Sequence, residues 1–339
     1  MGRKLKQPLF FFFLLNMALS CSAPVWQRVD MAQRQGDLPA AVAELENHLQ
    51  LHPQDARALY RLGEIYGEMG QWEKMVEAFE RAVNADARWE RDVEVTREYY
   101  WTENLNRGIA AFHRGAADSA LTFFHNATII LPRRPLAHRL VGEAARKLHD
   151  LPLAQQALET TLQLDSLDHR ARRLLMRVYF DRENFPAAIR EAATLLRHFP
   201  EEVEARRTIA YAYDRLDDRA NAGAAYQALL RISAHPRDYQ ACAAFMYRLG
   251  EYEQAIELSR QAIRYGGDAV ENLRAIAQVY LMQHRFEPLI ETAQEILKAK
   301  PDDLAALQLL QIAYAALDKR QELQKITQQI EEIQARLSR

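Results

Sequence analysis

The chain has 339 residues, of which 44 are basic and 46 acidic, so its formal charge of −2 offers no chain-wide attraction to nucleic acid. Its two cysteines, Cys21 and Cys242, are too few for a disulfide framework or for a zinc site built from four thiolates. Ala, Leu, Glu, Gln and Arg, which favour helices, are abundant, and runs of β-branched residues are missing. The composition therefore predicts an all-α protein.

The N-terminus has the three-part layout of a secretory signal. Basic residues are followed by an apolar run from Leu9 to Leu15 and then by small residues, and this run is too short for a permanent membrane span. We therefore predict that residues 1–20 are a signal peptide. The stretch Met-Ala-Leu-Ser-Cys that ends at Cys21 resembles a bacterial lipobox, which implies that Cys21 becomes a lipid-modified N-terminus. The following Ser22 implies an outer-membrane location facing the periplasm, and the alternative is an ordinary signal that leaves Cys21 unmodified.

From Ser22 onward the residues recur on a 34-residue frame. Position 8 of the frame is small in six units: Gly63, Gly108, Gly142, Ala210, Ala243 and Ala277. Position 24 is large: Leu45, Phe79, Phe124, Leu158 and Tyr226. Small residues are needed where two helices cross closely, because a larger side chain would push their axes apart. The frame therefore predicts pairs of tightly packed helices.

The helix-breaking residues obey the same frame. Prolines fall in the first turns of the predicted helices or between units, where no helix interior is disturbed. Glycine recurs at position 15, between the two helices of a unit, where a backbone with positive φ would end the first helix. These glycines are Gly36, Gly70, Gly115 and Gly250.

This pattern resembles the tetratricopeptide repeat, which combines Leu-Gly-x-x-Tyr in a first helix with Ala, Phe and Pro at fixed spacings in the second. The resemblance implies a right-handed superhelical solenoid of about nine helix-turn-helix units within residues 21–339. The first unit departs from the signature at Arg28 and Val29, and the last is more polar, as a capping pair would be. The predicted units are 22–55, 56–89, 101–134, 135–168, 169–202, 203–235, 236–269, 270–303 and 304–337.

Residues 90–100 interrupt the frame. They contain no Gly or Pro, so we predict that they are helical and lengthen the following helix by about three turns. This region is rich in aromatic residues, which we expect to pack against the core, with an exposed docking patch as the alternative. The aromatic residues are Trp89, Tyr99, Tyr100 and Trp101.

Positions 2, 5, 9 and 12 of the frame, called the groove positions below, point away from the packed face of the first helix. In the tetratricopeptide family these positions line the inner surface on which peptides or partner helices lie. Here they include six arginines across three consecutive units: Arg139, Arg146, Arg170, Arg173, Arg177 and Arg207. Because guanidinium groups bind carboxylates bidentately, we predict that this basic stripe binds an acidic partner. The alternative is pairing with Glu143, Glu204 and Asp214 of the same face.

No catalytic motif is present: Gly-x-Ser-x-Gly, His-Glu-x-x-His and a strand-bound Gly-x-Gly-x-x-Gly are all missing. His48 and His52 have the spacing of two metal ligands, but no third ligand lies near them in the sequence. Cys242 occupies a packing position and is expected to be a buried apolar residue. The sequence therefore predicts a non-enzyme without cofactor or metal.

Taken together, these features predict a non-catalytic scaffold, anchored by lipid in a bacterial envelope, that holds a partner peptide or subunit in its groove. In architecture it resembles the repeat-containing outer-membrane lipoproteins that help to assemble secretins or β-barrel proteins. The alternatives are a soluble cytoplasmic scaffold and an enzyme accessory subunit. The oligomeric state is left open by the sequence.

Overall fold

A computed structural model describes residues 24–337, so the predicted signal peptide and Cys21 lie outside the described residues. Within that range the chain forms eighteen α-helices and one short 3-10 helix, and no strand. The chain divides into two compact units, with the boundary after Val178. Each unit is described by itself below.

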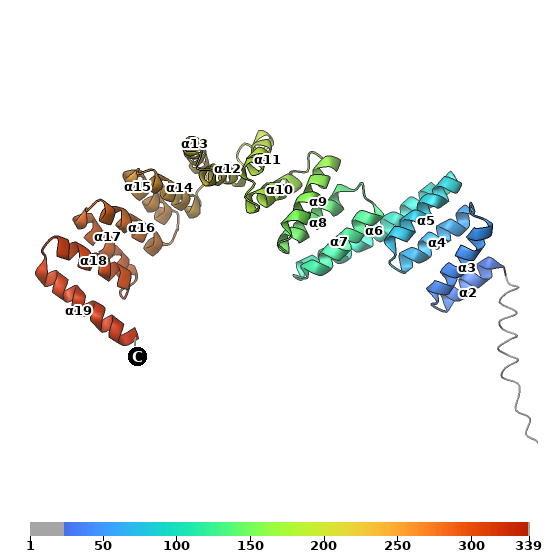
Figure 1. The fold of residues 1–339 in the computed structure, drawn as a ribbon, viewed down its shortest axis with the longest axis horizontal. Helices are drawn as coiled ribbons and strands as arrows, with labels where there is room; N and C mark the ends of the chain where they lie inside the picture. The colour runs from blue at the N-terminus through green and yellow to red at the C-terminus, as the bar shows by residue number, and fades with distance from the viewer. Residues whose placement is uncertain (1–23, 338–339) are drawn as a thin grey trace, which may run out of the picture. The chain divides into compact units, whose positions relative to one another are not determined.

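The first unit is built from successive helical hairpins (Figure 1). In this unit α2 pairs with α3, α4 with α5, α6 with α7 and α8 with α9. The helices are α2 (Val25–Arg34), α3 (Leu38–Leu51), α4 (Ala56–Glu68), α5 (Trp72–Ala85), the 3-10 helix η1 (Ala87–Trp89), α6 (Glu90–His113), α7 (Ala117–Ile130), α8 (Pro135–Lys147), α9 (Leu151–Leu164) and α10 (His169–Asp181), in which the boundary falls.

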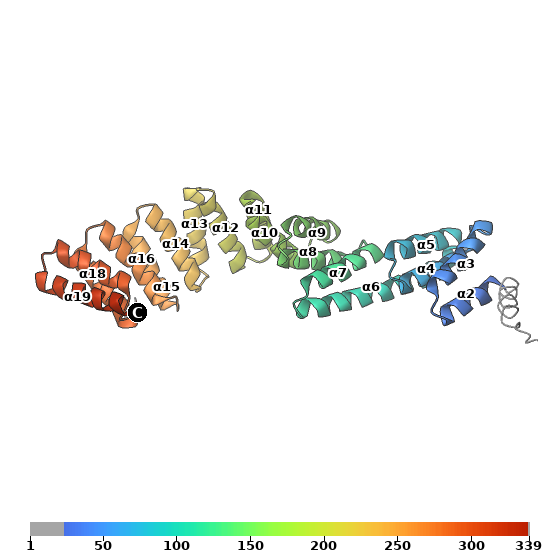
Figure 2. The same cartoon turned by 60° about the horizontal axis from the view of Figure 1, so that its bottom comes forward.

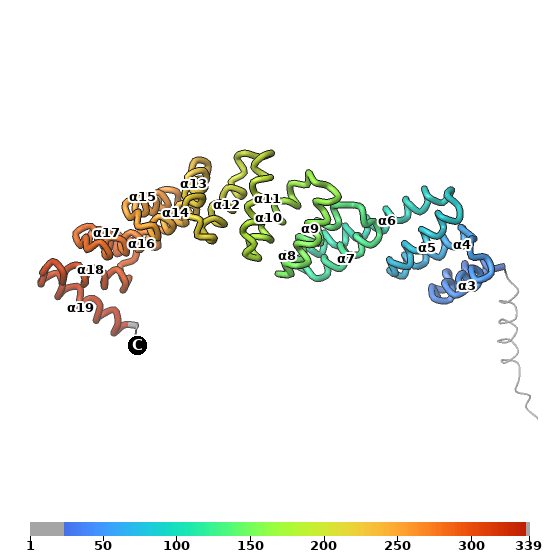
Figure 3. The backbone as a smooth tube through the Cα atoms, turned by 45° about the horizontal axis from the view of Figure 1, so that its top comes forward, coloured from blue at the N-terminus to red at the C-terminus, as the bar shows by residue number. Residues whose placement is uncertain are grey.

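The second unit continues in the same way, and its backbone runs from hairpin to hairpin (Figure 3). Here α12 pairs with α13, α14 with α15, α16 with α17 and α18 with α19. The helices are α11 (Phe185–His198), α12 (Val203–Arg215), α13 (Arg219–Leu230), α14 (Pro236–Arg248), α15 (Tyr252–Arg264), α16 (Ala269–Met282), α17 (Phe286–Ala299), α18 (Leu304–Ala316) and α19 (Arg320–Leu337). The all-α fold of about nine paired units is therefore confirmed.

The small residues at position 8 pack where the frame places them. A Cβ atom added to Gly63 or Gly108 would lie 2.5 Å from the ring of Phe79 or Phe124, at position 24 of the paired helix. A Cβ on Gly142 would lie 2.6 Å from Leu158. The prediction of close small-to-large packing within each hairpin is confirmed at these positions.

The first unit of the frame forms its first helix despite its departure from the signature. Val29 at position 8 is fully buried in α2, beside the equally buried Leu45 of α3. Arg28 turns to the side and its Nε donates to Glu44 at 2.9 Å. The departure at positions 7 and 8 is therefore accommodated, with Arg28 at the side of the helix pair and Val29 in its core.

Position 15 has a left-handed backbone in every hairpin of the frame. The four glycines predicted there have φ between 69° and 84°. Five other units reach the same conformation without glycine, at His149, Glu183, Asp217, His284 and Asp318, with φ between 49° and 61°. In several units an Asp or Asn follows and caps the next helix, as Asp150 does by accepting from the amide of Leu153 at 3.1 Å. The turn is thus set by the frame more than by the residue type.

Residues 90–100 form the first turns of α6, a single helix of 24 residues (Figure 2). Tyr100 packs on Gly67 of α4, where an added Cβ would lie 2.5 Å from its ring. Thr96 is hydrogen-bonded to Tyr60 of α4 at 2.9 Å, and Arg97 donates to the carbonyl of Ile130. The added turns are therefore fixed to their neighbours, and Tyr100 explains a glycine that the repeat alone does not.

The aromatic residues around the insertion differ in burial. Trp89 stacks on Tyr60 with ring centroids 4.7 Å apart, and Trp101 packs partly buried in the core. Tyr99 is 63% exposed on the opposite side of α6 from this core. The expectation of core packing thus holds for Trp89, Tyr100 and Trp101 and is wrong for Tyr99.

Candidate partner-binding site

Three of the arginines at position 5 join one repeat to the next. Arg139 lies 3.0 Å from Asp168, Arg207 binds Asp238, and Arg274 binds Asp303. In each case the aspartate stands at the start of the first helix of the following repeat, where Asp168 and Asp303 also cap that helix. We call each of these pairs an arginine clasp.

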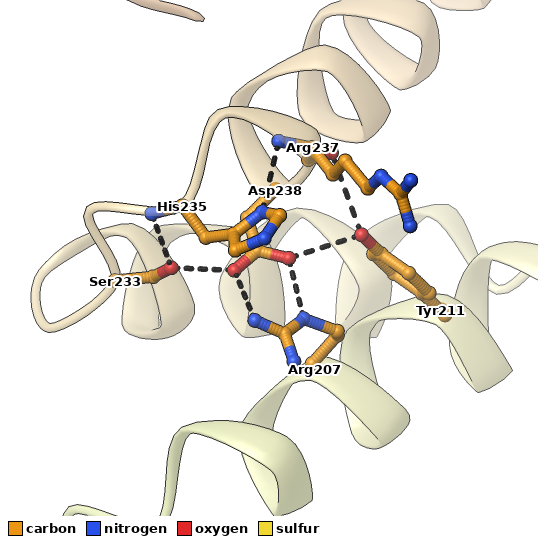
Figure 4. Close-up of polar contacts among 6 residues, drawn as sticks. All are labelled: Arg207, Tyr211, Ser233, His235, Arg237 and Asp238. Carbon is orange, nitrogen blue, oxygen red and sulfur yellow. Dashed lines mark hydrogen bonds and ion pairs between the residues drawn. The ribbon is translucent and has the colours of Figure 1, made fainter. Parts of the chain in front are cut away.

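The clasp at Asp238 is the most completely bonded of the three (Figure 4). Arg207 donates from Nε and Nη2 to the two carboxylate oxygens at 2.6 and 2.9 Å. The hydroxyl of Tyr211 donates at 3.0 Å, and that of Ser233, from the loop before α14, donates at 2.5 Å. Four donor atoms from three side chains thus converge on one carboxylate that has no solvent exposure.

The electrostatics of this cluster follow from burial and hydrogen bonding. Burial alone would raise the pKa of Asp238, but donation from Arg207 and Ser233 outweighs it and the pKa is lowered. Burial beside the same carboxylate raises the pKa of Tyr211. A charged Asp238 bridging α12 and α14 is therefore a structural element, and Arg207 is already engaged by it.

The other predicted arginines lie on α8 and α10. Arg146 is half-buried on α8, the helix that also carries Arg139. On α10, Arg170 is exposed, whereas Arg173 and Arg177 are half-buried. Binding of a partner carboxylate by these side chains stays a prediction, and for Arg139 and Arg207 a partner would have to compete with Asp168 and Asp238.

A cleft of about 320 Å³ lies between α14 and α16. Its floor is made of small or buried residues, among them Ala243, Ala255 and Ser259. Its walls are formed mainly by groove positions of two successive repeats: Gln240, Ala244, Tyr247, Glu271 and Gln278. The cleft thus lies on the face that the resemblance assigns to partners, and small alanines leave it open.

Three of the six polar residues that line this cleft are uncharged amides, namely Gln240, Asn272 and Gln278. Within residues 24–337, the side-chain amides of Gln240 and Gln278 have no hydrogen-bond partner in the protein. Tyr247 contacts the sulfur of Met282 at 2.5 Å, and Glu271 is the one acidic residue among the lining side chains. An amide both donates and accepts, as a peptide group does, so these side chains can pair with the main chain of an extended segment.

Sequence reasoning missed this cleft because it searched the groove positions for charge. The signal was present as Gln240 and Ala244 at positions 5 and 9 of the repeat that begins at Pro236, and as Gln278 at position 9 of the next repeat. The repeat that begins at His169 has arginine at both positions. The openness of the cleft, which depends on Ala244 and on Ala275 across from it, needed the three-dimensional packing.

The remaining candidates do not form a reactive centre. In the described part of the chain no three His, Cys, Asp or Glu side chains are grouped to hold a metal ion. Instead, His48 is hydrogen-bonded to Asp55 at 2.8 Å, and its ring centroid lies 4.7 Å from that of His52, with the two rings tilted by 42°. Cys242 is 3% exposed, as expected, and burial raises the pKa of its thiol to about 12. Between residues 24 and 337 no helix has the length and apolar character needed to cross a membrane.

Comparison with known proteins gives a family match in two parts of the chain. Tetratricopeptide repeat models match residues 32–93 and 174–236. No curated protein matches in sequence.

The solved structures to which the chain is similar have low sequence identity to it and TM-scores below 0.5. One is described as the functional characterization of Pseudomonas aeruginosa pilF, with 16% identity over 65% of this chain and 99% of that one, and a TM-score of 0.48. MamA from Desulfovibrio magneticus RS-1 has 16% identity over 49% of this chain and 94% of that one, with a TM-score of 0.47. YrrB, described as a TPR protein with an unusual peptide-binding site, has 16% identity over 51% of this chain and 89% of that one, with a TM-score of 0.46.

Proposed function

We propose that the chain, which matches tetratricopeptide repeat models in two stretches, is a protein–protein interaction scaffold of that type and holds an extended partner segment in the cleft between α14 and α16. The observation that carries this proposal is the pair of unbonded amides, Gln240 and Gln278, above a floor of small residues. The partner segment pairs its main chain with these amides and places an apolar side chain between them.

The test is a pull-down from a cell extract with the full chain. Ala244→Glu places a charged, longer side chain into the cleft, so partner recovery should fall about tenfold or more because an apolar group would meet a buried charge. Ala220→Glu is the matched control, since Ala220 is exposed at the start of α13 and far from the groove positions in the frame. Equal recovery of all partners by both variants would contradict the proposal.

We propose further that the scaffold is anchored by lipid at Cys21 in a bacterial envelope, facing the periplasm from the outer membrane. The lipobox-like stretch before Cys21 supports this proposal. Labelled fatty acid should be incorporated into the wild-type chain, and Cys21→Ala should lose both the label and the membrane fraction. A wild type without label, together with a Cys21→Ala variant that still sediments with membranes, would contradict lipid anchoring.

The basic residues of α8 and α10 are the basis of a separate proposal, which concerns the first unit alone. We propose that Arg146, Arg170, Arg173 and Arg177 bind carboxylate groups of a partner, because guanidinium groups bind carboxylates bidentately. Replacing Arg173 and Arg177 with Glu should weaken binding in the pull-down and remove its dependence on salt. An unchanged partner set would remove these residues from the site.

A further inference from the structure

One side of α6 exposes apolar side chains in the middle of the helix. It is called the outer face below because it lies opposite the side that packs on Gly67, and it includes Thr102 and Ile109, at groove positions 2 and 9 of the repeat that begins at Trp101. This outer face consists of Val95, Tyr99, Thr102, Asn106 and Ile109. Val95 and Tyr99 are each 63% exposed and Ile109 is 37% exposed. A shallow depression of about 520 Å³ runs over the first four of these residues. The surface is therefore a continuous, partly apolar strip.

No other helix among residues 24–337 carries three exposed large apolar residues. Most of the others lie at helix ends or in turns, as Leu51 and Leu167 do, where isolated exposure is ordinary. On α6 the opposite side is fixed by the Thr96–Tyr60 hydrogen bond and by the contact of Tyr100 with Gly67. The exposed side chains therefore stand on a helix that is held in place.

The spacing of the outer face suits a partner helix. Its residues follow one another at steps of four, three, four and three, which keeps them on one side of a helix that winds around another. A single helix laid along this strip would contact all five side chains. An extended peptide would follow only part of it.

We propose that the occupant is α6 of a second copy of this chain, packed antiparallel about a two-fold axis at Thr102. In that arrangement Val95 lies opposite Ile109 of the second copy, Tyr99 opposite Asn106, and Thr102 opposite itself. The apolar residue at each end thus meets an apolar residue. A closed two-fold pair also uses the same surface on both copies, so no free face is left over.

The charges at the two ends of α6 fit this orientation. At the N-terminal end of α6 the exposed Glu90, Asp92 and Glu94 outnumber Arg91, so this end is acidic on balance. It lies opposite His113 and Arg114 at the C-terminal end of the second copy. Antiparallel helices also place the positive end of one helix dipole beside the negative end of the other. Near the axis, Glu103 of each copy is already paired with its own Arg107 at 3.3 Å. A parallel pair would instead set Asp92 against Asp92.

Oligomeric state is the first test, measured by light scattering on the full chain. We expect a dimer with a dissociation constant of about micromolar order, as for small interfaces. Tyr99→Asp should weaken it about 100-fold or more, because each interface receives the substitution twice. Leu167→Asp is the matched control, since Leu167 is 64% exposed in a turn of the same unit and should leave the dimer intact.

Disulfide cross-linking tests the orientation. In the full chain with Cys21→Ser, Thr102→Cys should form a symmetric disulfide, whereas Cys242 is buried and does not compete. A Val95→Cys chain mixed with an Ile109→Cys chain should give cross-linked heterodimers, and neither should cross-link alone. Self-cross-linking of each chain alone would show a parallel pair and overturn the antiparallel assignment.

A wild type that stays monomeric at about 100 µM, well above the expected dissociation constant, would overturn the proposal. Loss of a different protein from the Tyr99→Asp pull-down, with a monomeric wild type, would assign the outer face to that protein and would also overturn it. Both results leave the proposal for the α14–α16 cleft standing, because that cleft lies on other helices.

Discussion

Replacing Arg207 with Met tests whether the arginine clasp is structural. Methionine keeps an apolar stem of similar length but removes both donors to Asp238, whose carboxylate is wholly buried. Removing one partner of a buried ion pair costs about 3 to 5 kcal/mol. Because the side chain of Arg207 is 31% exposed and Tyr211 and Ser233 still donate, we expect a smaller loss of about 2 to 3 kcal/mol.

Hydrogen exchange locates this loss. Amides of α12 and α14 should exchange about 30- to 150-fold faster in Arg207→Met, which is the same free energy expressed as an opening equilibrium. The four tryptophans all precede Val178, so their fluorescence reports on the first unit. The denaturant concentration at which this fluorescence signals unfolding should therefore be the same in Arg207→Met and in the wild type. Far-UV circular dichroism, which detects both units, should show the shift.

Arg206→Met is the matched control for this experiment. Arg206 is the neighbouring residue and donates to the carbonyl of Pro200, a neutral group, so its loss should cost less than about 1 kcal/mol. Combining Arg207→Met with Asp238→Asn should give a coupling of about 1.5 kcal/mol or more. If Arg207→Met is no worse than Arg206→Met, or if the two clasp substitutions simply add, the reasoning is refuted.

Gly108→Ala should destabilise the chain by about 1 to 2 kcal/mol in urea unfolding, because its Cβ would lie 2.5 Å from Phe124, and Phe124→Leu should restore part of the loss. His149→Gly should raise stability by about 0.5 kcal/mol or more, since His149 holds φ at 61°, and an unchanged midpoint would contradict this strain. Because folding lowers the pKa of Asp238, the free energy that its carboxylate contributes to folding is fully present above about pH 3.8 and is lost as the pH falls below that value. Asp238→Asn should therefore make the stability of the chain less dependent on pH in this acid range. Iodoacetamide at pH 8 should leave Cys242 unmodified until urea unfolds the chain, and fast alkylation of the folded chain would disprove its burial.

The helix pairs could be predicted from the sequence because a packing requirement repeats at fixed steps. Gly63 against Phe79 and Gly142 against Leu158 each satisfy that requirement within one hairpin, so the residue pattern carries it directly. The left-handed turns were predictable only where glycine marks them. Asp217 has the same left-handed backbone at position 15, but aspartate does not by itself indicate that conformation in a sequence.

The surfaces were harder to predict because they depend on contacts between repeats. The position-5 arginines have the residue type and spacing of a ligand site, yet Arg139 and Arg274 each meet an aspartate about thirty residues later in the chain. Tyr99 and Tyr100 are adjacent in sequence and differ only in which side of α6 they face. Whether that side meets Gly67 or solvent is decided by how α6 lies on α4, which one chain segment does not encode.

The arginine clasps also limit how freely these repeats can be rearranged. Each clasp has its cation in one repeat and its anion in the next, so a single repeat cut out and grafted elsewhere would carry half of it. A transplanted block that ended after Arg207 but before Asp238 would bring an unneutralised guanidinium to its new junction. Designers who recombine this chain should therefore move its repeats in neighbouring pairs, or supply the missing aspartate in the recipient.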